Sequence, residues 1–171
     1  MADSGKPKGG TSGEGLPQPR QGGQPAPQVP GRPQLTLAGA LGEVVWLMMQ
    51  SPGHRHLFLA DLEWLVMPAM MLGQFRTFRS GDQIAGLALW AIVSEEVEKR
   101  LTAGVIRLAP AEWKSGDRLW LVELVAPFGG VDAMIEDLKT TVFHDKTFKI
   151  RLTGADGRSV VTDVAGAGTG D

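Results

Sequence analysis

The chain carries, at residues 74–103, the stretch QFRTFRSGDQIAGLALWAIVSEEVEKRLTA, in which two strand patterns precede a helix pattern. Residues 74–79 and 84–93 predict a β-hairpin, because Ser80-Gly81-Asp82 between them is a typical turn sequence. Ser94 then predicts a helix N-cap, since acidic residues occupy the turn that follows it. A hairpin that leads directly into a surface helix, ending near Ala103, indicates an α/β domain.

Five further elements are predicted outward from this stretch by apolar periodicity. They are helices over residues 37–50, 61–73 and 131–142, and strands over residues 118–126 and 148–152. Pro68 is expected to kink the second helix, because proline cannot donate a backbone hydrogen bond inside a helix. The order of elements predicts an α/β fold with a mixed sheet flanked by helices.

The two ends of the chain differ in composition from the part between them. Residues 1–36 hold seven of the eleven prolines and eight glycines, so they predict a disordered tail that buries too little surface to fold. The folded domain is expected over residues 37–162, with a second flexible tail over residues 163–171. No apolar run is long enough to span a bilayer, and no secretory signal pattern follows Lys6 and Lys8.

Composition narrows the chemistry. The chain has 17 lysine and arginine residues against 19 acidic residues, so it carries no net positive charge. Composition therefore gives no reason to expect a nucleic-acid partner. The absence of cysteine excludes a disulfide scaffold and a thiol nucleophile. The three histidines show no ligand spacing, so no metal site is predicted.

Two short polar turns carry the candidate chemistry. One is Ser51-Pro52-Gly53-His54-Arg55, and the other is Ser115-Gly116-Asp117-Arg118. A histidine and a carboxylate can together move a proton at neutral pH, which predicts an acid–base enzyme. From the residues alone, a surface histidine and a turn aspartate that bonds its own backbone are the competing interpretations.

A set of spaced residues between 39 and 152 connects these turns to a known family. The set is Gly42, Trp46-Leu47, Ser51-Pro52, His54-Arg55, Leu65, Pro68-Ala69, Gln74, Trp90-Ala91, Glu112-Trp113, Ser115-Gly116-Asp117-Arg118, Trp120 and Ala126-Pro127-Phe128-Gly129. It resembles the RTX toxin-activating lysine acyltransferases of the hemolysin-activating type. The resemblance implies a fold like that of the Gcn5-related N-acyltransferases.

The resemblance also implies an activity and a site. The family transfers a fatty acyl chain from the phosphopantetheine thioester of acyl carrier protein to internal lysines of an RTX protoxin, in the cytoplasm and without a bound cofactor. Its essential histidine and aspartate are matched here to His54 and Asp117. Ser51, Arg55 and Arg118 are matched to supporting positions.

The chemistry expected of His54 follows from the acceptor. A lysine amine with a reference pKa of about 10.4 is largely protonated at pH 7, so a base must remove a proton during attack. His54 is the predicted base, and Asp117 is predicted to orient the imidazole or to stabilise its charged form. Direct transfer is favoured over an acyl-enzyme, because Ser51 lacks the G-x-S-x-G pattern of a serine nucleophile.

The donor is predicted from the loop after the strand at 118–126. Phe128, Gly129 and Gly130 form a weak donor-loop candidate that lacks the basic, multi-glycine spacing of coenzyme A sites, which favours acyl carrier protein. Five basic side chains could form a patch for that acidic protein, namely Arg55, Arg76, Arg79, Lys114 and Arg118. Met67, Met70, Met71, Trp120 and Phe128 could cover an acyl chain, although core packing suits most of them better.

Two other functions stay open at this point. One is an N-acetyltransferase that uses acetyl-coenzyme A and acts on a small molecule or a protein. The other is a non-catalytic adaptor that binds the toxin. The apolar helix over residues 61–73 is also compatible with a homodimer contact.

Overall fold

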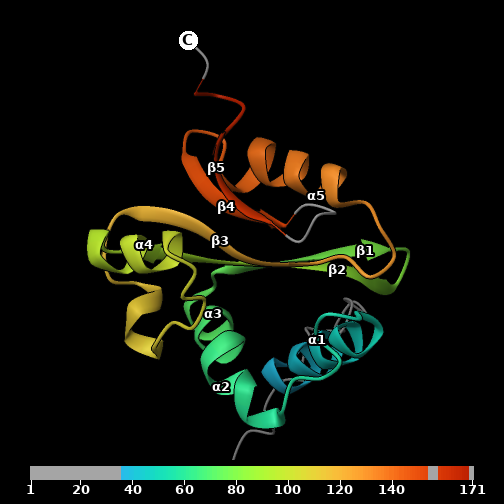
Figure 1. The fold of residues 1–171 in the computed structure, drawn as a ribbon. Coiled ribbons are helices and arrows are strands. Elements are labelled where there is room, and N and C mark those ends of the chain that lie inside the picture. The colour runs from blue at the N-terminus through green and yellow to red at the C-terminus, as the bar shows by residue number, and fades with distance from the viewer. Residues whose placement is uncertain (1–35, 154–157, 170–171) are drawn as a thin grey trace, which may run out of the picture. The chain divides into compact units, whose positions relative to one another are not determined.

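Five strands form one mixed sheet whose spatial order follows the chain, β1-β2-β3-β4-β5 (Figure 1). The computed structural model describes residues 36–153 and 158–169. The strands are β1 (Phe75–Ser80), β2 (Gln83–Val93), β3 (Arg118–Val125), β4 (Thr147–Thr153) and β5 (Ser159–Ala165). Adjacent strands are antiparallel except β3 and β4, which run parallel.

Helical segments connect and cover these strands. The α-helices are α1 (Leu37–Gln50), α2 (Leu62–Leu65), α3 (Met67–Leu72), α4 (Glu95–Thr102) and α5 (Val131–Asp137). Short 3₁₀ turns span Leu59–Asp61 (η1) and Pro110–Trp113 (η2), and a π-helical turn, Leu138–Val142 (η3), continues α5. The predicted α/β fold with a mixed sheet and flanking helices is confirmed. Its further likeness to Gcn5-related N-acyltransferases stays a prediction.

The sheet separates two hydrophobic cores. On the face covered by α1, α2 and α3, Leu47 and Ala69 are completely buried together with apolar residues of β2 and β3 (Figure 1). On the face covered by α5, Leu138 packs with Phe143 and Phe148. Both faces of the central strands are therefore buried, which explains why residues 84–93 are apolar without a break.

Local signals in the sequence determine where most elements begin and end. Ser94 caps α4, with its Oγ accepting a hydrogen bond from the Val97 amide at 3.4 Å, as predicted. The helix expected over residues 61–73 is divided at Val66, and Pro68 lies in the first turn of α3, where its missing amide costs least. Gly73 ends α3 in the left-handed region at φ 67°.

The C-terminal part differs from the prediction. The expected tail began at residue 163, but β5 pairs with β4 from Ser159 to Ala165, so the boundary at 162 falls inside a strand. The Ala167 amide also donates to the Lys139 carbonyl at 3.0 Å, which ties the following residues to η3. The folded domain thus extends beyond residue 162. The tail predicted over residues 1–36 lies outside the described residues apart from Thr36, which caps α1.

Gly116 lies where two backbone segments meet, and its replacement is expected to destabilise the fold. A Cβ atom there would lie 2.5 Å from the Val93 carbonyl oxygen and 2.6 Å from the Ser94 Cα. Gly116→Ala should therefore lower the free energy of unfolding by about 1–3 kcal/mol, measured by urea denaturation. Gly42→Ala is the matched control, because a Cβ on that glycine of α1 meets nothing within 4 Å. Equal stability of the two variants would contradict the predicted clash.

An ion pair between α4 and η2 predicts a pH-dependent contribution to stability. Arg100 donates to both carboxylate oxygens of Glu112 at 2.6 and 3.1 Å, and the Ala109 amide donates to the same carboxylate at 2.8 Å. The hydrogen bond from Arg100, followed by that from Ala109, lowers the pKa of Glu112 below its ordinary value. A lowered pKa in the folded state stabilises the fold above the unfolded pKa of about 4.3, and this contribution disappears as the pH falls through the folded value.

Glu112→Gln should accordingly lower the urea midpoint at pH 7, and the difference from the unchanged protein should shrink as the pH falls below about 4.3. The exposed Glu63→Gln is the control for loss of a carboxylate elsewhere on the surface. A difference that stays constant from pH 7 to pH 3 would show that the charge of Glu112 does not stabilise the fold.

Candidate active site

The turn after α1 holds His54 in place. Pro52 prevents α1 from continuing, and the amides of His54 and Arg55 donate to the Ser51 carbonyl at 3.1 and 3.0 Å. The Ser51 side chain is buried, with 8% of the residue exposed, and its Oγ lies 2.7 Å from His54 Nδ1. A short turn and a buried hydroxyl thus fix one edge of the imidazole ring.

The other edge of the ring meets a carboxylate. His54 Nε2 lies 3.0 Å from Glu123 Oε1, and the two side chains are 17% and 28% exposed. Both bonds are satisfied in neutral imidazole when the Ser51 hydroxyl donates to Nδ1 and Nε2–H donates to an ionised Glu123. Ser51, His54 and Glu123 therefore form one hydrogen-bonded series, which we call the Ser–His–Glu series.

A β-bulge turns Glu123 toward His54. In the pairing of β2 with β3, Leu89 faces Glu123 and Trp90 faces Leu121, so Val122 is an additional residue on β3. Val122 packs on the core beneath α1–α3, whereas Leu121 belongs to the core beneath α5. Strict alternation would place Glu123 on the same face as Leu121. The extra residue reverses this and directs the carboxylate to the face that carries His54.

The parallel strands β3 and β4 diverge beside this carboxylate. Their register pairs are Trp120 with Lys149 and Leu121 with Ile150, and no paired residues follow on β3. Beyond them lies a cleft of about 290 Å³ whose walls include His54, Glu123 and Arg151. We call it the β3–β4 cleft. The Ser–His–Glu series is thus accessible to a ligand from a partly polar space.

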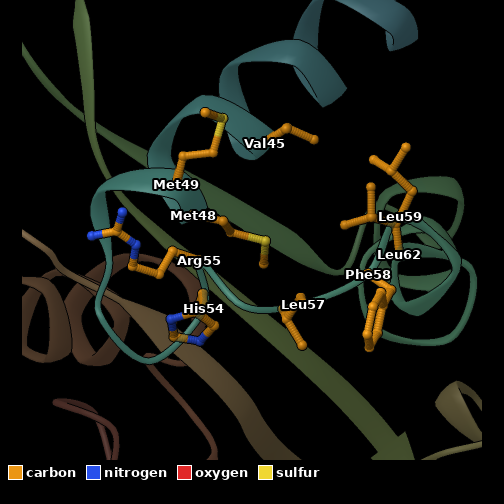
Figure 2. A pocket seen from close by; sticks show the side chains of 9 residues that line it. All are labelled: Val45, Met48, Met49, His54, Arg55, Leu57, Phe58, Leu59 and Leu62. Atoms are coloured by element: carbon orange, nitrogen blue, oxygen red, sulfur yellow. The ribbon is translucent and has the colours of Figure 1, made fainter.

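A second cavity, of about 160 Å³, reaches His54 from the side of α1 (Figure 2). Its other walls are almost entirely apolar, and Arg55 lies at its rim with an exposed side chain. His54 and Leu57 line both this cavity and the β3–β4 cleft. The imidazole therefore stands at the junction of an apolar and a partly polar space.

Asp117, predicted as the partner of His54, is not brought to it. Asp117 is exposed and precedes β3, six residues before Glu123 along an extended strand, which corresponds to roughly 20 Å. Neither carboxylate side chain is long enough to bridge that separation. In the structure, Glu123 occupies the position that the sequence analysis assigned to Asp117.

The turn that holds Asp117 has a structural explanation. Ser115 Oγ accepts a hydrogen bond from the Ser94 amide at 3.0 Å and donates to the Glu112 carbonyl at 2.9 Å. Arg118 pairs with Glu98 at 2.8 Å, which joins the start of β3 to α4. Because these contacts connect β2, α4, η2 and β3, the turn serves the scaffold, and Arg118 lies with it rather than beside His54.

The remaining predicted residues are distributed over the surface. Phe128 is 61% exposed and lies beside Trp46, with ring centroids 6.2 Å apart, and Gly129 and Gly130 have φ values of 87° and 84°.

The expected basic patch is largely neutralised. Arg76 pairs with Asp137, Arg79 with Glu43, and Arg118 with acidic residues of α4.

Among the methionines and aromatics considered for an acyl chain, Met70 and Trp120 are core residues. Within the described residues, no three histidine or acidic side chains are grouped closely enough to hold a metal ion. No helix in that same part of the chain is both long and apolar enough to cross a membrane.

Glu123 was missed by the sequence analysis, although one signal for it was available. It is the only charged residue inside the otherwise apolar run 119–126, Leu-Trp-Leu-Val-Glu-Leu-Val-Ala. A lone carboxylate in a central strand is unusual enough to suggest a functional role. Sequence spacing alone did not indicate which histidine it would meet.

An α/β domain that holds a histidine between a buried hydroxyl and a carboxylate, at the wall of a cleft, has a site suited to acid–base catalysis. Residues 34–164 match the model of the RTX toxin acyltransferase family. Because this match spans most of the chain, the protein belongs to that family. The resemblance inferred from the sequence motifs is confirmed.

Individual relatives agree with this assignment. The chain is 37% identical over 107 residues to lysine-acyltransferase RtxC of Vibrio cholerae, covering 60% of the chain and 68% of that protein. It is 31% identical over 123 residues to an uncharacterized protein of Synechocystis, covering 71% and 84%. It is 32% identical over 109 residues to protein-lysine myristoyltransferase HlyC of Escherichia coli, covering 64% of each.

Proposed function

We propose that the protein transfers a fatty acyl chain from acyl carrier protein to the ε-amino group of an internal lysine in an RTX protoxin, in the cytoplasm. The observation that carries the proposal is the Ser–His–Glu series at the wall of the β3–β4 cleft. The names of the relatives, a lysine-acyltransferase and a protein-lysine myristoyltransferase, support a protein lysine as acceptor.

The site supplies what a lysine acceptor needs. At pH 7 a lysine with a reference pKa of about 10.4 must lose a proton at a cost of about 4.6 kcal/mol before it can attack. The Glu123 carboxylate attracts the ammonium group into the cleft and holds it beside His54. The ammonium group releases its first proton to solvent, which leaves a neutral amine facing the imidazole.

The transfer step then balances around the thioester carbon. The amine nitrogen forms the new C–N bond, and the C–S bond breaks as the thiolate leaves. The second amine proton passes to the Nε2 lone pair of His54, in the tautomer whose Nδ1–H donates to Ser51 Oγ. The imidazolium gives this proton to the departing sulfur, so the step ends with an amide and a free thiol. Glu123 stabilises the imidazolium in between, and Ser51 keeps the ring oriented through Nδ1.

Ser51 is proposed as a positioning residue and not as a nucleophile. Its hydroxyl is directed at His54 Nδ1, and only 8% of the residue is exposed, whereas Glu123 lines the β3–β4 cleft. A buried hydroxyl in this position is poorly placed to receive an acyl group from a large donor. Direct transfer therefore stays the proposed route.

Acyl carrier protein is proposed as the donor because it is acidic and carries its acyl chain on a flexible arm. Arg151 in the β3–β4 cleft and Arg55 at the rim of the apolar cavity provide positive charge on both sides of His54. Phe128, Gly129 and Gly130 are retained as a proposed contact for the donor. An acetyl-coenzyme A donor is the competing proposal, and a homodimer stays a prediction.

The experiment mixes the protein with acyl carrier protein that bears a C14 or C16 chain and with a candidate RTX protein. Peptide mass spectrometry is expected to find the acyl mass on lysine. Transfer from acetyl- or acyl-coenzyme A but not from acyl carrier protein would overturn the donor assignment. Acyl mass on Ser51 after incubation with donor alone would overturn direct transfer.

A further inference from the structure

We infer that the apolar cavity between α1 and residues 57–62 binds the acyl chain of the donor and selects its length. This inference rests on the proposed function and names a subsite within it. The apolar walls of the cavity are Val45, Met48, Met49, Phe58, Leu59 and Leu62, with Leu57 beside His54 (Figure 2). We call this cavity the α1 pocket.

The position of the α1 pocket carries the inference. It includes the imidazole, which must lie next to the thioester carbonyl during transfer, and apart from His54 and Leu57 it shares no wall with the β3–β4 cleft. An acyl chain attached to that carbonyl can therefore enter the pocket while the polar arm of the donor stays in the cleft. Figure 2 shows that these side chains come from two segments, α1 on one side and the segment that carries Phe58, Leu59 and Leu62 on the other.

The exposure of the pocket walls indicates that something apolar covers them. Met49, Phe58 and Leu59 are 61%, 79% and 79% exposed, although all three surround one cavity. A soluble domain rarely leaves such a group of large apolar side chains in water unless a ligand or partner binds there. Met48 and Met49 are unbranched and can adjust to a flexible chain.

The dimensions favour an alkyl chain over a protein partner. A volume of about 160 Å³ is well below the roughly 300–1,000 Å³ typical of drug-sized ligands, so the pocket suits a narrow chain. Its floor includes Met48, which is 4% exposed, so the pocket penetrates to the core rather than forming a flat docking surface. The carbons nearest the carbonyl would be buried in the pocket, and the carbons farther along the chain would contact Phe58 and Leu59.

The test measures binding without turnover. Acyl carrier protein is loaded with S-alkyl phosphopantetheine thioethers of 6 to 16 carbons, which lack a carbonyl and cannot be transferred. Affinity for the unchanged protein is expected to rise about fourfold for each methylene buried and then to level off once the pocket is filled. An affinity independent of chain length would overturn the inference.

Two variants test where the alkyl chain of the donor binds. Val45→Trp should fill the pocket and shorten the length at which affinity levels off, and Leu59→Asp should weaken only the longer chains. Met71→Asp is the matched control, because Met71 is 74% exposed on α3 and does not line the pocket. Length profiles of Val45→Trp and Leu59→Asp that equal that of the unchanged protein would overturn the inference.

A diazirine at the end of the alkyl chain provides a direct readout. Cross-links are expected to the walls that the pocket does not share with the cleft, namely Val45, Met48, Met49, Phe58, Leu59 and Leu62. Cross-links to Ile106 or Thr153 of the β3–β4 cleft would overturn the inference. These measurements require no catalysis. If they succeed but no lysine is acylated, the pocket stands and the proposed function fails; if lysine is acylated but the length profiles do not change, the pocket fails alone.

Discussion

His54→Ala is expected to reduce acyl transfer to lysine by about 10²- to 10⁴-fold, since it removes the group that we propose as the acceptor of the amine proton. The substitution leaves Ser51 and Glu123 in place but removes both hydrogen bonds that join them. Initial rates with acyl carrier protein and an RTX protein, followed by mass spectrometry, provide the measurement. The drop is expected in kcat more than in KM, because the imidazole acts during bond formation.

His56→Ala is the matched control for this variant. His56 lies two residues away in the same turn, is exposed, and lines neither of the cavities that meet at His54. Its removal should leave the rate within about twofold of the unchanged protein. Unchanged transfer by a His54→Ala protein with native circular dichroism would rule out the proposed mechanism. If both forms bind the protoxin and neither acylates it, the non-catalytic adaptor is favoured.

Glu123→Gln is the second substitution with a large expected effect. Glutamine preserves the size of the side chain and can accept a hydrogen bond from His54, but it cannot attract an ammonium group or stabilise an imidazolium. A loss of about 10²-fold or more in kcat/KM is expected from the same assay. Glu123→Asp should recover part of this loss, because the charge is retained while its reach is shortened.

Asp117→Asn distinguishes this assignment from the one suggested by sequence. Asp117 is exposed before β3 and far from His54, so its amide variant should act within about threefold of the unchanged protein. Loss of activity in Asp117→Asn with full activity in Glu123→Gln would reverse the assignment and contradict the geometry of the site.

The hairpin, the capped helix α4 and the strand β3 could be predicted from sequence because their signals are local. Ser94 determines the start of a helix within one turn, and the apolar run of residues 84–93 defines a single strand. The structure confirms the capped helix and the strand. The strand β5, Ser159–Ala165, was missed because it lies near the glycine-rich end, where the predicted domain stopped at residue 162 and the predicted tail began at residue 163. Its pairing with β4 is a tertiary contact that composition does not reveal.

The site was predicted only in part, for a similar reason. Ser51 and His54 are three residues apart in one turn, so their proximity could be anticipated from sequence. Glu123 is 69 residues from His54, and its direction depends on the irregular pairing beside Val122. Period-two alternation, the rule used to interpret a strand, would place this carboxylate on the opposite face. The Ser115–Arg118 turn, by contrast, looked catalytic from its composition but connects elements of the scaffold.

The bulge at Val122 makes the direction of Glu123 depend on how β3 pairs with β2. The pairing holds Glu123 opposite Leu89, on the face that carries His54. Regular pairing onward from Trp90 and Leu121 would instead place Val122 opposite Leu89 and Glu123 opposite Ala88, which belongs to the core beneath α5. A slip of one residue in this pairing, with no change in the sequence, would therefore direct the carboxylate to the opposite face and separate it from His54.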